Sequence, residues 1–277
     1  MQALAEDFRR QGQTIAFVPT MGYLHDGHLS LIAAGRQMAD TLVVSIFVNP
    51  AQFGPGEDYE NYPRDPERDR NLAETAGTDV LFMPGKDQLY PEGYETYVTQ
   101  MHLPNHLCGL SRPTHFSGVT TIVAKLFNIV KPHYAVFGKK DYQQMAIVRK
   151  MAADLNFDTQ IIGAPIVRES DGLALSSRNK YLNPQQRQSA LSLNRALAEA
   201  QQMVAGGETR AETIIEKAAR IITAQPETEI DYVRICDPET LEDAAVVDRP
   251  VLMALAVHVG QTRLIDNTML AQSGEQQ

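Results

Sequence analysis

The sequence predicts an α/β fold in which a doubly wound parallel sheet is followed by a smaller C-terminal α+β domain. In the first 167 residues, short apolar runs alternate with segments of helical periodicity, which is typical of βαβ units and of a mainly parallel sheet. After residue 167, two helical segments precede three strand-like runs, which is typical of an α+β domain. We therefore expect a Rossmann-like domain over residues 1–167 and a small domain over residues 168–277, with a boundary near residues 167 to 175.

Five short apolar runs predict the strands of the first domain. They are rich in β-branched residues and are bounded by polar residues, Gly or Pro, as buried strands are. They cover residues 14–18, 41–48, 79–83, 133–138 and 159–163. In a sheet of this kind, ligands bind beyond the carboxyl ends of the strands, near the point where the strand order reverses. Residues that follow these runs are therefore the first candidates for a site.

Helical periodicity predicts the helices between these strands. The segments cover residues 28–39, 65–77, 115–130 and 139–155. The third is the clearest, because its apolar residues recur at spacings of three and four: Val119, Ile122, Val123, Leu126, Phe127 and Val130.

The C-terminal region begins with a polar, loop-like stretch that starts near residue 167. It continues with predicted helices over residues 184–205 and 209–224, joined at Gly206-Gly207. Strands are predicted over residues 229–235, 250–259 and 262–270, with a turn at Gly260-Gln261 between the last two.

Composition and charge exclude several classes of protein. The formal net charge of −9 argues against general affinity for nucleic acids, which requires a basic surface, although a local group of donors can still bind an anionic small molecule. Cys108 and Cys236 are too few for a disulfide framework or a cysteine-based metal site. No run approaches the roughly 18 apolar residues of a membrane span, and the N-terminus carries no signal-peptide pattern, so we expect a cytoplasmic protein.

The stretch PTMGYLHDGHLSL, residues 19–31, places two histidines around a glycine directly after the first predicted strand. A helix that begins near Gly27 or His28 would point unpaired backbone amides and the positive end of its dipole toward the end of that strand. Such a helix start binds phosphate, and Gly22 and Gly27 let the backbone approach a ligand. The plainer interpretation is a strand-to-helix turn with two incidental surface histidines. Their joint spacing around Gly27 favours the phosphate site.

Within this stretch, HDGH resembles the HxGH signature of the nucleotidyltransferase superfamily, which includes the class I aminoacyl-tRNA synthetases and uses the signature to bind ATP. The wider stretch PTMGYLHDGHLSLI is more specific and resembles the pantoate–β-alanine ligases, the pantothenate synthetase family. Further segments of that family follow along nearly the whole chain: VSIFVNPAQFGPGEDYENYPRD (44–65), RPTHFSGVTTIVAKLFNIVKP (112–132), FGKKDYQQ (137–144) and VRESDGLALSSRNKYL (167–182). Family members typically begin several residues earlier, with a short strand, whereas here Met1 opens directly into QALAEDFRRQG.

The resemblance implies an ATP-binding ligase of pantothenate (vitamin B5) and coenzyme A biosynthesis. It would condense (R)-pantoate with β-alanine to pantothenate and release AMP and pyrophosphate, through a pantoyl adenylate intermediate. Mg²⁺ would accompany ATP mainly through its phosphates, with no protein ligand assigned. The family also implies a homodimer and a C-terminal domain that forms a lid over the active site. We expect small-molecule substrates and neither a nucleic acid nor a membrane as a partner.

The resemblance implies ATP contacts in three segments. They are Met21, Gly22, Tyr23, Leu24, His25, Asp26, Gly27 and His28 in the opening stretch; Gly138, Lys139, Lys140 and Asp141 after the fourth strand; and Val167, Leu175, Ser176, Ser177 and Arg178 in the polar stretch. It gives catalytic roles to His25, His28, Lys140 and Arg178, with the two cations balancing charge on the departing pyrophosphate. From the residues alone, Lys139 to Asp141 at the start of the predicted helix could equally be a solvated cap, and the serine-rich stretch could be a linker.

The resemblance assigns pantoate and β-alanine to side chains elsewhere. Gln52, in the long loop after the second strand, and Gln144, in the helix after Lys140, carry neutral amides suited to hydroxyl and carboxylate groups. Asn49, Arg112 and His115 are expected to line the same pocket. Loops this long are usually functional or disordered, and the aromatic residues of this one argue against disorder. The alternative is an extended Pro- and Gly-rich connection, with Arg112 and His115 in structural roles.

Three other functions remain open on the sequence. A nucleotidyltransferase that forms no amide would share HxGH but would give no reason for the loop that carries Asn49 and Gln52, or for Gln144. A non-catalytic nucleotide sensor would be favoured by loss of either histidine or of Lys140, and all three are present. A histidine metallohydrolase would need a third ligand, and none accompanies the two histidines at a recognisable spacing.

Overall fold

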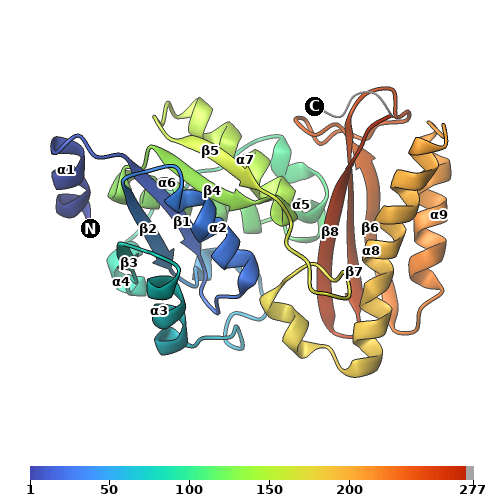
Figure 1. Ribbon diagram of the computed structural model, residues 1–277, viewed down its shortest axis with the longest axis horizontal. Helices are drawn as coiled ribbons and strands as arrows, with labels where there is room; N and C mark the ends of the chain where they lie inside the picture. The colour runs from blue at the N-terminus through green and yellow to red at the C-terminus, as the bar shows by residue number, and fades with distance from the viewer. Residues whose placement is uncertain (273–277) are drawn as a thin grey trace. The chain divides into compact units, whose positions relative to one another are not determined.

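The structure, a computed structural model of the chain, describes residues 1–272 and divides them into two units (Figure 1). The first unit comprises residues 1–104, 112–139 and 144–167, and the second comprises residues 105–111, 140–143 and the chain from residue 168 onward. The first contains a parallel sheet with flanking helices, and the second contains an antiparallel sheet with two long helices. The predicted fold class, α/β with a smaller α+β part, is confirmed.

Within the described residues, the sheet of the first unit has the strand order β3-β2-β1-β4-β5, and every neighbouring pair is parallel. Its strands are β1 (Ile15–Thr20), β2 (Thr41–Ile46), β3 (Val80–Phe82), β4 (Tyr134–Gly138) and β5 (Gln160–Ala164). The chain runs outward from β1 through β2 to β3 and then returns to the other side of β1 at β4. The strand order therefore reverses between β1 and β4, and ligands of such sheets bind at the carboxyl ends beside that point.

Alternate side chains of β1 face different layers of helices. Ala16 and Val18 belong to a buried cluster with Ile32 of α2 (Asp26–Arg36) and Ala73 of α3 (Pro66–Thr75). Phe17 points to the other face, where its ring packs edge-on against Phe127 of α6 (His115–Val130), with ring centroids 6.5 Å apart. Helices thus cover both faces of the sheet, which leaves its carboxyl edge as the place for a site.

The predicted helices of the first unit occur, with shifted ends. The helix predicted over residues 28–39 is α2, which begins earlier, at Asp26, and ends at Arg36. The helix predicted over residues 139–155 is α7 (Tyr142–Asp154), and the 3-10 helix η3 (Lys139–Asp141) precedes it. Lys140 thus stands at the start of a helical segment as predicted, but this segment opens with a 3-10 turn, because the chain leaves β4 through a tighter turn before α7 begins.

Several elements of the structure were not predicted from periodicity. They are α1 (Gln2–Arg10), the single-turn helices α4 (Lys86–Leu89) and α5 (Cys108–Ser111), and the 3-10 helices η1 (Pro50–Gln52), η2 (Leu103–Asn105) and η4 (Ser177–Tyr181). Apart from α1, these elements have three to five residues, which is too short to repeat an apolar spacing, so tertiary contacts determine them.

The described part of the second unit has a three-stranded antiparallel sheet of order β6-β7-β8. Its elements are α8 (Pro184–Ala205), α9 (Ala211–Thr223), β6 (Thr228–Cys236), β7 (Val251–Val259) and β8 (Thr262–Leu270). Leu193 and Ile214 of the two helices share one buried cluster with Leu255 of β7, the central strand. Gly260, with φ +57°, makes the two-residue turn between β7 and β8, so the predicted turn is confirmed.

Candidate active site

The turn that follows β1 is built around two left-handed residues. Gly22 has φ +85° and Tyr23 has φ +50°, a conformation that side chains other than Gly rarely adopt. At Gly22 a Cβ atom would lie 2.8 Å from Cγ2 of Ile46, so there is no room for a side chain. Thr20 fixes the start of the turn, because its hydroxyl donates to the carbonyl oxygen of Ser45 at 2.8 Å and accepts from the N–H of Gly22 at 3.2 Å.

His25 and His28 lie side by side at the start of α2. His25 is the N-cap residue, and the N–H groups of His28 and Leu29 donate to its carbonyl oxygen at 2.7 and 3.0 Å. The N–H of His25 donates in turn to Nδ1 of His28 at 3.3 Å, and the two ring centroids are 4.1 Å apart. Because Nδ1 of His28 accepts this bond, the neutral ring carries its proton on Nε2. His28 therefore presents a hydrogen-bond donor at Nε2, as a phosphate partner requires.

The short helix η1 after β2 carries Gln52 in a buried hydrogen-bonded group. Asn49 caps this helix: its Oδ1 accepts from the N–H of Ala51 at 3.4 Å and from the hydroxyl of Tyr90 at 2.8 Å. Its Nδ2 donates to the carbonyl oxygen of Gly118 at 3.1 Å and to Oε1 of Gln52 at 3.2 Å. With 1% of its surface exposed, Asn49 contacts Gln52 and the backbone of α6. The amide nitrogen of Gln52 lies 2.9 Å from Sδ of Met21.

Arg112 and His115 both bind the backbone of Gln52. Nδ1 of His115 lies 2.8 Å from the carbonyl oxygen of Gln52, and Nη2 of Arg112 donates to the same oxygen at 3.3 Å. Arg112 also binds the carboxylate of Glu57 through two bonds of 2.7 and 2.6 Å. Burial acts to raise the pKa of Glu57, but its hydrogen bonds to Arg112 and the guanidinium charge outweigh this effect and lower the pKa below its ordinary value. Both predicted residues thus hold the loop that carries Gln52.

In the second unit, Lys140 is fixed through its backbone. Its carbonyl oxygen accepts a hydrogen bond of 2.8 Å from Nδ2 of Asn267 on β8. The side chain is 19% exposed, with Nζ 3.7 Å from Oδ1 of Asp141. The main chain of Lys140 is therefore held by β8, and its side chain is mostly buried beside Asp141.

The polar stretch that contains Ser176 to Arg178 is anchored at its start to the same strand. Arg168 donates from Nη1 and Nη2 to the two carboxylate oxygens of Asp266 at 2.6 and 2.9 Å, and Asp266 is 3% exposed. Further along, Ser176 caps η4, since its Oγ accepts from the N–H of Arg178 at 3.3 Å. Two successive residues of β8, Asp266 and Asn267, thus hold two of the predicted ATP-binding segments.

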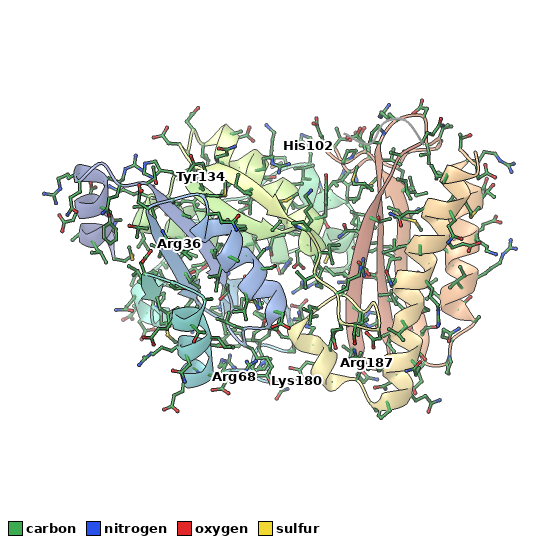
Figure 2. All side chains as sticks on the ribbon, in the orientation of Figure 1. Arg36, Arg68, His102, Tyr134, Lys180 and Arg187 are labelled. Carbon is green, nitrogen blue, oxygen red and sulfur yellow. The ribbon has the colours of Figure 1, made fainter. Side chains whose placement is uncertain are left out.

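A second set of charged contacts supports this stretch from α8. Arg187, near the start of α8 (Figure 2), donates to Oε2 of Glu169 at 2.6 Å and to Oδ2 of Asp171 at 2.9 Å. Nδ2 of Asn179 donates to Oε1 of Glu169 at 2.8 Å and to the carbonyl oxygen of Ala174 at 3.1 Å. The polar composition that suggested a linker belongs instead to a hydrogen-bonded loop.

The structure places the predicted site residues in four sets. Met21, Asn49, Gln52, Arg112 and His115 form one hydrogen-bonded group in the first unit, and His25 and His28 form another at the start of α2. Lys140, Asp141, Leu175, Ser176, Ser177 and Arg178 belong to the second unit. The last set comprises the remaining predicted residues of the first unit. Asp26 and Lys139 are exposed. The others are buried or half-buried: Gly22, Tyr23, Leu24, Gly27, Gly138, Gln144 and Val167.

Several residues of this arrangement were missed by the sequence analysis. The most telling is Asp69 of α3, whose carboxylate accepts from the N–H groups of Tyr23 and Leu24 at 2.7 Å each. A signal for it was present, because Asp69 lies three and four residues before Leu72 and Ala73 and thus on the apolar face of the predicted helix. Glu57, Tyr90, Asp266 and Asn267 were also missed, and no spacing in the sequence marks them.

A hollow of about 230 Å³ opens beside the turn in the first unit. Its lining comes from residues that follow β1, β2 and β3: Met21, Gly22, Tyr23, Ile46, Phe47, Val48, Tyr59, Arg64, Asp65, Pro66, Asp69, Pro84 and Lys86. The hollow therefore lies at the carboxyl edge of the sheet, on the side of β1 that faces β2 and β3.

Among residues 1–272, no group of three or more His, Cys, Asp or Glu side chains is placed to hold a metal ion. Cys108 and Cys236 are buried, and burial raises the pKa of the Cys236 thiol to about 12. In the described part of the chain, no helix is long and apolar enough to cross a membrane.

Comparison with known proteins decides the family. A family model described as pantoate-beta-alanine ligase matches residues 1–269. The chain belongs to the pantoate–β-alanine ligase family. It is 59% identical over 270 residues to the pantothenate synthetase of Desulfatibacillum aliphaticivorans, with 98% of this chain and 96% of the relative covered. It is 57% identical over 277 residues to that of Geobacter sulfurreducens, with 100% of this chain and 97% of the relative covered.

Solved structures of the pantoate–β-alanine ligase family share the fold. The pantothenate synthetase of Thermus thermophilus matches with a TM-score of 0.91 at 45% identity, with 95% of this chain and 96% of that chain covered. The pantoate-beta-alanine ligase of Francisella tularensis, complexed with beta-gamma ATP and beta-alanine, matches with a TM-score of 0.79 at 33% identity, with 96% and 95% covered. The family resemblance drawn from the motifs is confirmed.

Proposed function

We propose that the protein condenses pantoate with β-alanine to form pantothenate, with ATP as the energy source, and releases AMP and pyrophosphate. The observation that carries this proposal is the family match over residues 1–269, because it includes every motif segment from the HDGH turn to Arg178. The reaction has two steps. The pantoate carboxylate first attacks the α-phosphorus of ATP, and the amine of β-alanine then attacks the acyl adenylate and displaces AMP.

The first step must bring two anions together, and the chain's own donors offset their repulsion. We assign phosphate contacts to Lys140 and Arg178, whose charges balance the departing pyrophosphate. Nε2–H of His28 donates to the region between the α- and β-phosphates as negative charge develops there. His25 supports His28 through the bond from its backbone N–H to Nδ1. The first-turn amides of α2 contribute the positive end of the helix dipole.

Pantoate is assigned to the amides of Gln52 and Gln144. The buried group around η1 supports this role for Gln52, because Asn49 holds its Oε1 and because His115 and Arg112 hold its backbone carbonyl. We therefore give Asn49, Arg112 and His115 the task of fixing Gln52. A site held this firmly can keep the acid in line with the α-phosphorus, which contributes on the order of 7–11 kcal/mol at most for well-oriented reactants.

Further parts of the proposal come from the family. Mg²⁺ enters bound to the phosphates of ATP, a route that needs no cluster of protein ligands. The second unit, which carries Lys140 and Arg178, contributes to the ATP site as a lid. The enzyme works as a homodimer in the cytoplasm. The Francisella tularensis ligase complexed with beta-gamma ATP and beta-alanine supports both molecules as ligands of this chain.

The rival functions explain fewer of the residues. A nucleotidyltransferase that forms no amide gives no role to the buried group that fixes Gln52. A nucleotide sensor gives no role to the two glutamines assigned to pantoate. A metallohydrolase leaves Nδ1 of His28 engaged with the backbone instead of a metal ion.

The direct test is product analysis with the purified chain. Pantoate, β-alanine, ATP and Mg²⁺ are incubated together, and pantothenate, AMP and pyrophosphate are quantified by mass spectrometry and phosphate assay. We expect the three products in equal amounts, and neither pantothenate nor AMP when any one substrate is omitted. Release of ADP and phosphate, or AMP without pantothenate, would contradict the proposal.

A further inference from the structure

Asp69 binds the backbone of the turn that leads into the two histidines. Its Oδ2 accepts from the N–H of Tyr23 and its Oδ1 from the N–H of Leu24, both at 2.7 Å. The side chain is almost fully buried, with 1% of the residue exposed. A buried carboxylate with one short bond to each oxygen has a fixed position, so it also fixes the two peptide groups that it binds.

The backbone conformation of this turn favours a negatively charged group beside its N–H groups. Gly22 and Tyr23 are both left-handed, and successive N–H groups in such turns point into one concave space that favours negative charge. A Cβ atom on Gly22 would stand 3.0 Å from Oδ2 of Asp69, so the glycine lets the carboxylate approach. The guanidinium of Arg68, which projects from α3 (Figure 2), lies over the ring of Tyr23 at 5.3 Å and holds the side chain of the strained residue.

Three successive backbone amides connect Asp69 to His28 through hydrogen bonds. The amides of Tyr23 and Leu24 are held by the carboxylate, and the next amide, that of His25, donates to Nδ1 of His28 at 3.3 Å. The direction of this third amide depends on the two before it, since peptide planes are rigid and only two dihedrals separate each pair. Because the N–H of His25 donates to Nδ1 of His28, it leaves the ring proton of His28 on Nε2.

We propose that Asp69 is a positioning residue that keeps His28 in the tautomer with its proton on Nε2. This inference rests on the proposed adenylation, in which Nε2–H of His28 is the donor to the reacting phosphates. Asp69 does not touch the substrate in this account. It acts through the turn 22–25, and its loss changes which ring nitrogen of His28 carries the proton.

The chain offers a matched control for a purely structural role. Asp40 also binds backbone with a carboxylate: its Oδ2 accepts from the N–H of Thr14 at 2.8 Å and from the hydroxyl of Thr14 at 2.7 Å. These bonds lie at the amino ends of β1 and β2, the opposite edge of the sheet from the histidines. Asp40→Asn therefore removes the charge of a carboxylate that binds backbone at an exposed place, without reaching the turn.

The first test is the nitrogen spectrum of His28. Protein labelled with ¹⁵N in histidine is compared with His28→Gln to assign the ring signals, and the chemical shifts report which nitrogen is protonated. We expect Nε2–H alone for His28 in the unmodified enzyme and in Asp40→Asn, and a mixture of tautomers in Asp69→Asn. The unmodified spectrum needs no folded variant, so a proton on Nδ1 there would overturn the proposal even if Asp69→Asn failed to fold.

The second test is kinetic and uses pyrophosphate exchange as the measure of adenylation. Asp69→Asn should lower kcat by on the order of 10²-fold, the cost of a misplaced catalytic group, with the ATP KM within a few fold. In a His28→Gln background the same change should cost less than about threefold, because the two residues act as one unit. The Asp40→Asn variant should catalyse pyrophosphate exchange at the rate of the unmodified enzyme. Equal losses in both backgrounds would show that Asp69 does not act through His28.

The two tests separate this inference from the proposed function. If the unmodified enzyme made no pantothenate, the function would be wrong, and the tautomer spectrum would still decide the role of Asp69. If the enzyme made pantothenate and Asp69→Asn kept both the tautomer and the exchange rate, only the positioning role would be wrong.

Discussion

The side-chain amide of Asn267 donates to the carbonyl oxygen of Lys140 at 2.8 Å and so ties η3 to strand β8. The preceding residue, Asp266, binds Arg168 through both carboxylate oxygens. One strand thus holds the lysine and the start of the loop that carries Arg178. In the proposed reaction both cations act on the triphosphate, and neither is needed once pyrophosphate has left.

Lys140→Ala should therefore impair the first step and spare the second. We expect a loss of on the order of 10²-fold in adenylation, measured as pyrophosphate exchange, because one charged donor to the leaving group is removed. The reaction of synthetic pantoyl adenylate with β-alanine should keep a rate within about threefold of the unmodified one. Lys150→Ala, which removes an exposed lysine paired with Asp154, is the control for loss of a surface charge. Similar losses in both steps would indicate a structural role for Lys140.

His28→Ala should lower kcat for adenylation and leave ATP binding nearly unchanged. A donor that strengthens its bond as charge develops contributes about 10²–10³ in rate, or roughly 3–4 kcal/mol of barrier. His28→Gln should recover part of the loss, because an amide N–H can occupy a similar place. The measurements are rapid-quench kinetics of adenylate formation and the ATP dissociation constant by calorimetry. If ATP binding weakened in parallel with kcat, His28 would be only a ground-state phosphate ligand.

Gly118→Ala should displace Gln52 from its place. A Cβ atom on Gly118 would lie 2.2 Å from the carbonyl oxygen of Ala51 and 2.6 Å from the N–H nitrogen of Gln52, so η1 must move away from α6. We expect the KM for pantoate to rise at least tenfold, as for Gln52→Ala, with the KM for ATP within about threefold. Steady-state kinetics with each substrate varied in turn provides the comparison.

The matched control for Gly118→Ala is Gly85→Ala, where a Cβ atom would make only an ordinary contact of 3.8 Å with Gln88. Its pantoate KM should equal that of the unmodified enzyme. An equal rise in both KM values for Gly118→Ala would mean that η1 shapes the site as a whole and does not serve pantoate in particular.

His133 links the stability of the first unit to pH. Burial, with a smaller contribution from the charge of Arg9, lowers the pKa of His133 below its ordinary value of 6.5, and its Nδ1 accepts from the N–H of Ile15 at 2.9 Å. Because the folded pKa is the lower one, the unfolded chain binds the proton first as pH falls. The stabilisation is therefore fully present above pH 6.5 and is lost as pH falls through the folded pKa.

The measurement for His133 is the thermal midpoint between pH 8 and pH 5, compared with His133→Gln. The unmodified enzyme should exceed the variant at high pH, and the difference should shrink as pH falls. His102→Gln, at an exposed position labelled in Figure 2, controls for the loss of an imidazole as such. A difference that stays constant over the whole range would contradict the linkage.

The strands and the longer helices could be predicted because the spacing of apolar residues along the sequence reflects which side chains are buried. The alternation of Ala16 and Val18 with Phe17, and the spacing from Val119 to Val130, follow directly from a covered sheet and an amphipathic helix. The turn at Gly260 was predictable for a different reason, since few residues other than Gly adopt its backbone.

The contacts that orient the site could not be predicted in the same way. Asn49 was expected to contact the substrate, but two of its partners, Tyr90 and Gly118, come from separate parts of the chain and meet it only in the folded unit. The place of Lys140 depends on Asn267, which is 127 residues away in sequence. The motifs identify the side chains assigned to the reaction, whereas most of the residues that hold them are brought near by tertiary structure and leave no local pattern in the sequence.

The most direct test of the whole account is isotope exchange in the absence of β-alanine. The enzyme is incubated with pantoate, ATP, Mg²⁺ and labelled pyrophosphate, and label in ATP is measured over time, with a parallel sample that lacks pantoate. We predict rapid exchange that requires pantoate and does not require the amine, because pantoyl adenylate forms and reverts on the enzyme. Exchange that began only when β-alanine was added, or that proceeded without pantoate, would contradict the two-step mechanism.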